Sequence, residues 1–270
     1  MNPQQLAEEM QRLQMEYAAN PSPENLAKMQ GEMMRLQQEM ISMQAAAMDT
    51  AFGDDEEEEL KKFTEEHPPA PGKAKYLPIG AFLLTINGEP CGTFALIGDK
   101  EEWREGISEG WDIAGVEAGR EMLKSLLRGR HSRVFDDDYR KFKAGKPHKL
   151  DEDSVEAYND MLETLGEDLP ALLSYAKNCK TILAWDLERA GYLARIFAHL
   201  GWISEKESFD WLKKTAAQIK ESFGCWEEYA VSVMAGRALH FEDADPVIGA
   251  ACELFGDKKE LFDSNPVSGL

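Results

Sequence analysis

The sequence predicts a mainly α-helical fold: a compact multi-helix domain preceded by a Met/Gln-rich N-terminal helical hairpin and an acidic linker. Two observations predict this class. Apolar residues recur at alternating three- and four-residue spacing in three consecutive stretches of residues 182–240, and again within residues 22–43. That spacing is the period of an amphipathic helix. Ser, Pro and Gly stand at the borders of these stretches, where helices begin and end.

Three regions follow from this pattern. Residues 1–50 are predicted to form a coiled-coil-like helical hairpin arm, residues 51–75 an acidic, Pro-rich linker, and residues 76–270 a globular helical domain. A hydrophobic content of 43% and six Trp residues suit a globular core. A chain of 270 residues can hold one large domain with an appendage.

The three stretches near the C-terminus predict three packed helices that form the core of the domain. Gly201 ends the first helix. Ser204 and Glu207 form a capping box for the second helix, and Gly224 closes it. The third helix begins near Trp226. The three seams are Leu183, Asp186, Ala190, Leu193, Phe197 and Leu200; then Phe209, Leu212, Ala216, Ile219 and Phe223; then Trp226, Ala230, Val233, Arg237 and His240.

Two charged residues interrupt these seams, Asp186 in the first helix and Arg237 in the third. An unpaired buried charge is costly, so Asp186 should have a cationic partner. Arg237 is the first candidate, and Arg189 or Arg195 the second, because a guanidinium bonds a carboxylate bidentately. One interpretation is a buried ion pair that fixes the helix register. The other is a polar cluster, joined by His131, that binds an anionic ligand.

The N-terminal arm holds nine of the twelve Met residues. Ser22 as N-cap, with Pro23 at the first helical position, begins one of its two predicted helices. The heptad seam of that helix is Leu26, Met29, Met33, Leu36, Met40 and Met43. Met packs adaptably, which favours docking of a protein partner or self-association through the arm. The alternative is a hairpin packed on its own domain, or a marginal helix pair.

Between the arm and the three helices the local signals are mixed. Asp54–Glu59 is an unbroken acidic run, and the Pro-rich stretch His67–Gly72 cannot continue a helix. A solvated spacer is predicted there; binding of a basic partner is the alternative. Leu77–Asn87 fits a strand, a hairpin or a short helix. The further expectations are a helix over Ile113–Leu127, a basic cluster at Arg128–Arg133, a loop over Asp136–Asp151, and helices over Ser154–Leu165 and Pro170–Lys177.

The net charge of −20 disfavours partners that need clustered cations. Nucleic acid and anionic membrane surfaces are therefore not expected as partners, and a basic or neutral protein is. The chain has no run of 18 apolar residues and no secretory signal at its N-terminus. Its four cysteines form no CxxC pair, which is typical of reduced thiols in a cytoplasm.

No motif for nucleotide binding, serine hydrolysis or zinc hydrolysis is present, so no catalytic residue, metal or cofactor is predicted. Asp136–Asp138 lacks the second carboxylate motif that a divalent cation site needs. His199 is expected to be exposed, on a polar helical stripe with Glu188, Tyr192 and Arg195. Trp185, Trp202 and Trp226 are expected to anchor the core between helices.

Several segments together resemble a bacterial family known as domain of unknown function 1266. The specific ones are Ala184-Trp185-Asp186-Leu187-Glu188-Arg189-Ala190, Leu193-Ala194-Arg195, Gly201-Trp202-Ile203-Ser204, Trp226-Glu227-Glu228 and Gly236-Arg237. Looser matches are Leu77–Ala81, Asn87-Gly88, Trp111–Ile113, Gly129–His131 and Asn265-Pro266. The resemblance spans about residues 77–267 and implies a mostly helical, bacterial, cytoplasmic domain. It favours a helix over Leu77–Asn87 and implies no particular activity. One departure is Cys225, where the family tends to have Ser, so no side-chain cap is expected there.

Two functions remain. The first is a non-catalytic protein-interaction module that uses the arm. The alternative is an enzyme or a small-anion binder that uses the polar cluster of Asp186, Arg189, Arg195, Arg237 and His131. The alternative needs a pocket on which these side chains converge. Side chains that are fully packed and mutually paired would favour the first function.

Overall fold

A computed structural model describes Arg12 and residues 58–270, and the chain divides into two units, residues 1–62 and 63–270. The described residues contain helices and no strand, which confirms the mainly α-helical prediction. The predicted seam of the arm lies outside the described residues. Residues 58–66, within the predicted linker, are helical.

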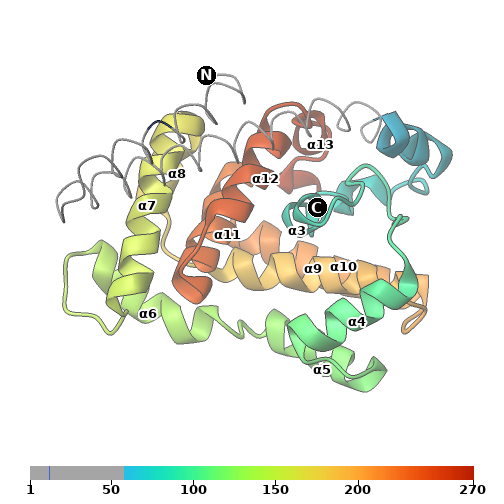
Figure 1. The fold of residues 1–270 in the computed structure, drawn as a ribbon, viewed down its shortest axis with the longest axis horizontal. Coiled ribbons are helices and arrows are strands. Elements are labelled where there is room, and N and C mark those ends of the chain that lie inside the picture. The colour runs from blue at the N-terminus through green and yellow to red at the C-terminus, as the bar shows by residue number, and fades with distance from the viewer. Residues whose placement is uncertain (1–11, 13–57) are drawn as a thin grey trace. The chain divides into compact units, whose positions relative to one another are not determined.

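Eleven α-helices and two 3-10 turns order the second unit between residues 74 and 269 (Figure 1). They are η1 (Ala74–Tyr76), α3 (Ala81–Ile86), α4 (Lys100–Trp111), α5 (Val116–Leu127), α6 (Ser132–Lys143), α7 (Glu152–Asp168), α8 (Pro170–Asn178), α9 (Leu183–His199), α10 (Glu205–Ser222), α11 (Trp226–Phe241), α12 (Asp245–Phe255), α13 (Glu260–Asp263) and η2 (Val267–Gly269). None of the described helices is long and apolar enough to cross a membrane.

Helix α9 is the centre of this unit. It packs against α10, α11, α5, α3 and α6. Figure 1 shows α9 and α10 side by side across the middle, with α11 above them and α5 and α6 below. Every residue from Ala184 to Phe197 is buried, and Leu187, Leu193 and Ile196 are 0% exposed. The predicted core of three consecutive helices is confirmed.

The predicted helix borders in this core also hold. The Ser204 hydroxyl accepts a hydrogen bond from the Glu207 N–H at 3.2 Å, which is one half of the predicted capping box, whereas the Glu207 carboxylate accepts from Arg120. Gly201 follows α9 with a φ of 72°, a left-handed conformation that ends helices. Helix α11 begins at Trp226, and the Cys225 thiol makes no cap hydrogen bond.

Close approach of backbones fixes how α9 meets its neighbours. Gly80 has a φ of 89°, and a Cβ on it would lie 2.6 Å from the backbone N of Tyr192. A Cβ on Gly191 would lie 2.4 Å from Cγ2 of Ile79. On the α11 side, a Cβ on Gly236 would lie 2.3 Å from Cβ of Trp185. Only glycine allows these contacts, which bring the segment before α3 and helix α11 directly onto α9.

Two local predictions need correction. The predicted loop over Asp136–Asp151 is wrong in its first half, because α6 continues to Lys143. Only Ser132 and Tyr139 of α6 are buried, and many of its other residues are charged. Because of this charge, the apolar side of the helix was not recognised in the sequence. The sequence left strand, hairpin and short helix as alternatives for Leu77–Asn87. The structure has helix α3 within this segment, as the family resemblance favoured.

Candidate functional site

The candidate site begins with Asp186, in the first turn of α9 and 0% exposed. Its carboxylate accepts the backbone N–H of His131 at 3.0 and 3.1 Å and that of Ser132 at 2.9 Å. These N–H groups open helix α6, whose N-cap residue supplies no side-chain cap of its own. Since the first N–H groups of a helix lack partners within it, Asp186 acts as the cap of α6 from another helix.

Asp186 also orients the imidazole of His131, which is 8% exposed. The His131 Nδ1 lies 2.6 Å from the carboxylate Oδ1. A carboxylate only accepts, so Nδ1 donates to it, and Nε2 is the ring nitrogen left to accept from another group. Nη1 of Arg189 lies 3.0 Å from that Nε2 and donates to it. The hydrogen bonds thus run from Arg189 to His131 to Asp186.

The Arg189 guanidinium is held by two aromatic rings. Its Cζ lies 4.3 Å from the ring centroid of Trp111 and 5.3 Å from that of Trp185. Such contacts attract a cation to the ring face. Burial lowers the pKa of Arg189 to about 10, with smaller effects from Asp186, Arg130 and Arg237. The side chain therefore stays charged at neutral pH.

His240, at the end of α11, completes the cluster. Its ring centroid lies 4.2 Å from that of His131. Burial lowers the pKa of His240 to about 4, and the nearby His131 and Arg189 add to the effect, so the ring is neutral at pH 7. Within the part of the chain that the structure describes, its Nδ1 is buried without a hydrogen-bond partner, and so is Nε1 of Trp185.

Arg237 does not pair with Asp186, so the first pairing predicted from the sequence is wrong. Its Nε donates to the backbone carbonyl of Asp243 at 3.0 Å, and its Nη2 lies 3.3 Å from the Asp243 carboxylate. Its Cζ lies 4.5 Å from the ring centroid of Phe241. The sequence misled here because backbone N–H groups and a histidine satisfy Asp186 in place of an arginine.

Arg195 lies apart from the other cluster residues and is 1% exposed. It donates to the carbonyls of Leu77 and Pro90 at 3.4 Å each, and to that of Thr93. Burial lowers its pKa to about 10. Arg195 thus ties the segment around α3 to α9. Of the predicted cluster, the structure joins His131, Asp186 and Arg189 by hydrogen bonds, places Arg237 nearby, and separates Arg195.

The predicted polar stripe on α9 is also wrong, because Glu188, Tyr192 and Arg195 are all buried. Glu188 is 0% exposed and accepts the N–H groups of Gly80 at 3.1 Å and Leu83 at 3.2 Å, and the Tyr229 hydroxyl at 2.8 Å. Burial raises its pKa to about 7.

The contacts of two further polar side chains were not anticipated from the sequence. His199 was expected to be exposed, but it is half-buried, with Nε2 2.9 Å from the Gly98 carbonyl. Glu89 is 4% exposed and accepts the N–H groups of Ile97 and Gly98 at 2.8 Å each. Both contacts fix the loop before α4. No local signal in the sequence marks either role, because most of their partners are backbone groups; Glu89 also accepts the indole N–H of Trp103.

A cation site is absent from the described residues, among which no three metal-binding side chains converge. Asp136, in the predicted weak motif, instead accepts the Thr181 hydroxyl at 2.6 Å and the Ile182 N–H at 2.8 Å. Asp137 points to solvent and pairs with Lys141 at 2.6 Å. These carboxylates therefore hold the entry to α9 and the surface of α6.

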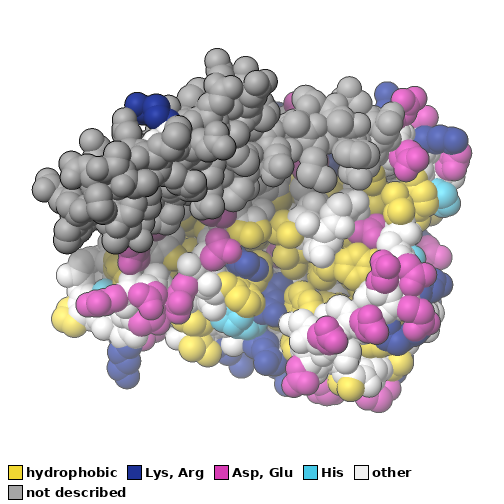
Figure 2. Space-filling view, viewed as in Figure 1, with side chains coloured by type: hydrophobic (Ala, Val, Ile, Leu, Met, Phe, Trp, Pro, Cys, Tyr) yellow, Lys and Arg dark blue, Asp and Glu magenta, His cyan; other side chains and the backbone are white. Residues whose placement is uncertain are grey.

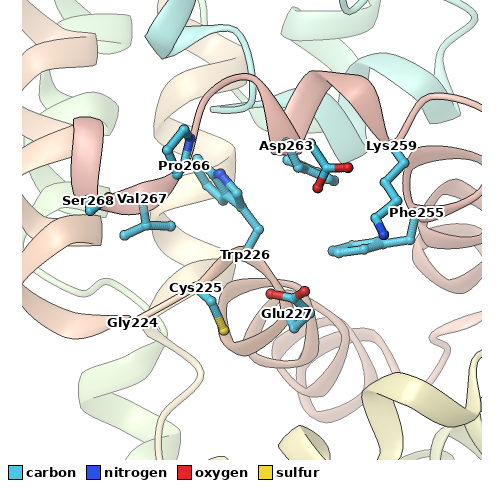
Figure 3. Close-up of a pocket in the computed structure, with 11 residues that line it drawn as sticks. Gly224, Cys225, Trp226, Glu227, Phe255, Lys259, Asp263, Pro266, Val267 and Ser268 are labelled. Atoms are coloured by element: carbon cyan, nitrogen blue, oxygen red, sulfur yellow. The ribbon is translucent and has the colours of Figure 1, made fainter.

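The hollows that lie elsewhere in the unit include the following two. One, of about 220 Å³, is drawn in Figure 3, where the rings of Trp226 and Phe255 face it from either side and the carboxylates of Glu227 and Asp263 lie at its edges. The other, of about 620 Å³, lies between the ends of α8 and α10 and the start of α11; its walls include Tyr175, Lys180 and Phe223. Neither is lined by a residue of the predicted cluster.

Comparison with known proteins gives one match. Residues 106–258 match the family model described as "Protein of unknown function (DUF1266)", and this span is more than half of the chain. It includes every residue of the predicted cluster. No curated protein and no solved structure matches the chain. The chain is therefore a member of the DUF1266 family.

Proposed function

We propose that this chain is a non-catalytic protein-interaction module that binds an acidic segment of a partner protein beside His131 and His240. The observation that carries the proposal is a pair of exposed apolar side chains next to a group of arginines. Phe241 is 47% exposed and Val134 is 68% exposed. Exposed apolar side chains bordered by arginine are typical of protein-binding surfaces.

The two apolar side chains lie near one point on the molecule. Val134 follows His131 by three residues in α6, and Phe241 directly follows His240. Because the two histidine rings lie 4.2 Å apart, Val134 and Phe241 are each within about one helical turn of the same contact. We call Val134, Phe241 and the adjacent Arg130 and Arg237 the Phe241 face.

The charge of this face is the reverse of that of the whole chain, which carries −20. Figure 2 shows Lys, Arg and His side chains gathered in the lower middle of the surface, over the connection between α5 and α6. Arg237 stacks on Phe241. An acidic segment with an apolar side chain complements such a surface in both charge and hydrophobicity.

The hydrogen bonding of the cluster favours binding over catalysis. A general base needs a free lone pair that faces the substrate. The Asp186 carboxylate already accepts from two backbone N–H groups and from His131. Nε2 of His131 already accepts from Arg189. Both residues of the Asp186–His131 pair already use their acceptors within the protein, which supports a structural role for them. The enzyme alternative lacks a free general base in this cluster.

The predicted arm is a second element of the proposal. Its seam, from Leu26 to Met43, lies outside the described residues, so its part in binding or self-association rests on the heptad spacing alone. A cytoplasmic location also belongs to the proposal, supported by the cysteine usage of the chain.

The test is partner capture by the tagged full chain in cells of its source organism, with chemical cross-linking and quantitative mass spectrometry. The variant replaces Phe241 and Val134 by Ser. Its matched control is Ile97→Ser, because Ile97 is 48% exposed and lies before α4. We expect the Phe241/Val134 variant to lose specific partners by about tenfold, a typical effect of removing one interface anchor.

The control should retain those partners, and both variants should keep the thermal unfolding midpoint of the parent chain. A third variant, Met33→Glu with Leu36→Glu, tests the arm in the same experiment. Retention of every partner by the Phe241/Val134 variant contradicts the proposed face. Loss through the arm variant alone would move the interaction to the arm.

A further inference from the structure

Arg189 has hydrogen-bond donors that the protein does not use. One of its terminal nitrogens, Nη1, donates to His131. Its other N–H groups have no acceptor among the described side chains and backbone groups. The nitrogens of Arg189 that lack a partner remain accessible to solvent. The contacts with Trp111 and Trp185 hold the plane of the guanidinium. A fixed guanidinium edge presents two parallel donors, the arrangement that binds two oxygens of a carboxylate or phosphate.

Two buried polar atoms beside Arg189 also have no partner. Trp185 is 1% exposed, yet its indole Nε1–H donates to nothing in the described part of the chain. The Nδ1 of His240 is likewise buried and unpaired. A buried donor without an acceptor costs about 1–3 kcal/mol, so such groups are rare unless water or a ligand occupies the site.

The charges around these donors favour an anion. Arg130 and Arg237 lie close enough to Arg189 to lower its pKa. The Asp186 carboxylate offsets part of this charge, but its oxygens are already taken by His131 and Ser132. An incoming anion would therefore meet cationic donors without competing for Asp186.

We propose that Arg189, with Trp185 beside it, binds an oxyanion group, either a carboxylate or a phosphate. This deepens the proposed function and rests on it where the acidic group belongs to a partner protein. The same site takes a free small anion, because the donors recognise the oxygens and not the molecule that carries them.

The experiment titrates the full chain with sodium phosphate and, separately, with sodium acetate, each against sodium chloride at equal ionic strength. The readout is the indole N–H resonance of Trp185 in 1H–15N NMR spectra, assigned by its loss in Trp185→Phe. We expect a saturable shift of this resonance with phosphate or acetate and none with chloride. The tighter of the two anions identifies phosphate or carboxylate as the preferred group.

The matched variants are Arg189→Lys, which keeps the charge and removes the fork, and Arg140→Lys, which changes an exposed arginine of α6. Arg189→Lys should weaken binding about tenfold, the loss expected for one bidentate contact. Arg140→Lys should leave it unchanged.

If Arg189→Lys fails to fold, Arg130→Gln replaces it, and weaker binding is again expected because a neighbouring positive charge is lost. Equal shifts with chloride, or unchanged affinity in the variant that folds, overturn the inference. The Phe241 face is tested separately, by partner capture with the Phe241 and Val134 variant. Failure of anion binding at Arg189 and failure of partner binding at the Phe241 face are therefore distinguishable.

Discussion

Two faces of α9 each bury one carboxylate and one guanidinium, and they use them differently. On the first face, Glu188 accepts from the backbone of the segment leading into α3 and from Tyr229. Arg195 donates to three backbone carbonyls around the same segment, and its Nε is closed to solvent without an acceptor among the described residues. On the second face, Asp186 caps α6 and fixes His131, but most N–H groups of Arg189 have no acceptor among the described residues.

The difference separates structural charges from candidate binding groups. A buried charge whose bonds go to backbone groups of another segment ties that segment down. A guanidinium whose unmatched donors still reach solvent, as those of Arg189 do, can bind a group that the chain does not supply. Burial alone therefore does not identify a site on this helix; donors that are both unmatched and open to solvent do.

The largest expected effect is that of Arg195→Met, on the structural face. It leaves the carbonyls of Leu77, Pro90 and Thr93 without their buried donor, so we expect the free energy of unfolding to fall by about 3–5 kcal/mol. Urea denaturation measures it. The control Arg104→Met, at an exposed arginine of α4, should change stability by less than about 0.5 kcal/mol. A loss as small as that of the control would show that Arg195 does not hold this segment.

The next effect is a pH dependence from Glu188. Its pKa is about 7 in the folded chain, above its ordinary value of 4.5, so the folded state binds the extra proton. The stability that this group contributes is present below pH 4.5 and is lost as pH rises through 7, by about 3 kcal/mol. The free energy of unfolding of Glu188→Gln should lack this fall when it is measured from pH 4.5 to 8.

A control is needed because repulsion within an acidic chain also grows with pH. Glu109→Gln, at an exposed position of α4, should follow the parent curve. If Glu188→Gln follows it as well, the proton is not taken up at Glu188.

The smallest effect belongs to the second face, in Asp186→Asn. An amide keeps one acceptor oxygen but turns its NH2 group toward the N–H groups of His131 and Ser132. We expect a loss of about 1–3 kcal/mol in the free energy of unfolding, measured with urea. Asp137→Asn, at an exposed position of α6, is the matched control. Unchanged stability in Asp186→Asn would mean that α6 does not depend on this cap.

The sequence predicted the core helices well because their signals are local. Ser204 caps a helix by its own side chain, Gly201 ends one by its own conformation, and the seam residues recur at the helical period. The family resemblance also follows from local runs of residues. Helix α4 gives no comparable apolar pattern, since Ile107 is its only buried residue.

The candidate site was predicted in part. The interruptions at Asp186 and Arg237 correctly marked a buried charge that needs a partner, and His131 and Arg189 were among the residues named. The partner itself was wrong, because the sequence does not show which backbone N–H groups lie near a carboxylate. Glu188 was placed on a solvent-facing stripe for the same reason, although Tyr229 and the segment before α3 enclose it.

The sequence by itself determined the helical class, the core of α9, α10 and α11, the borders of these helices and the family. Those features depend on the order of side chains within one turn or a few turns of helix. Only the tertiary structure decided that α9 is enclosed on all sides, that its carboxylates cap other helices, and that Arg189 keeps unused donors beside Trp185. These depend on backbone groups brought together from distant parts of the chain, and backbone hydrogen-bonding groups are the same in every residue except proline.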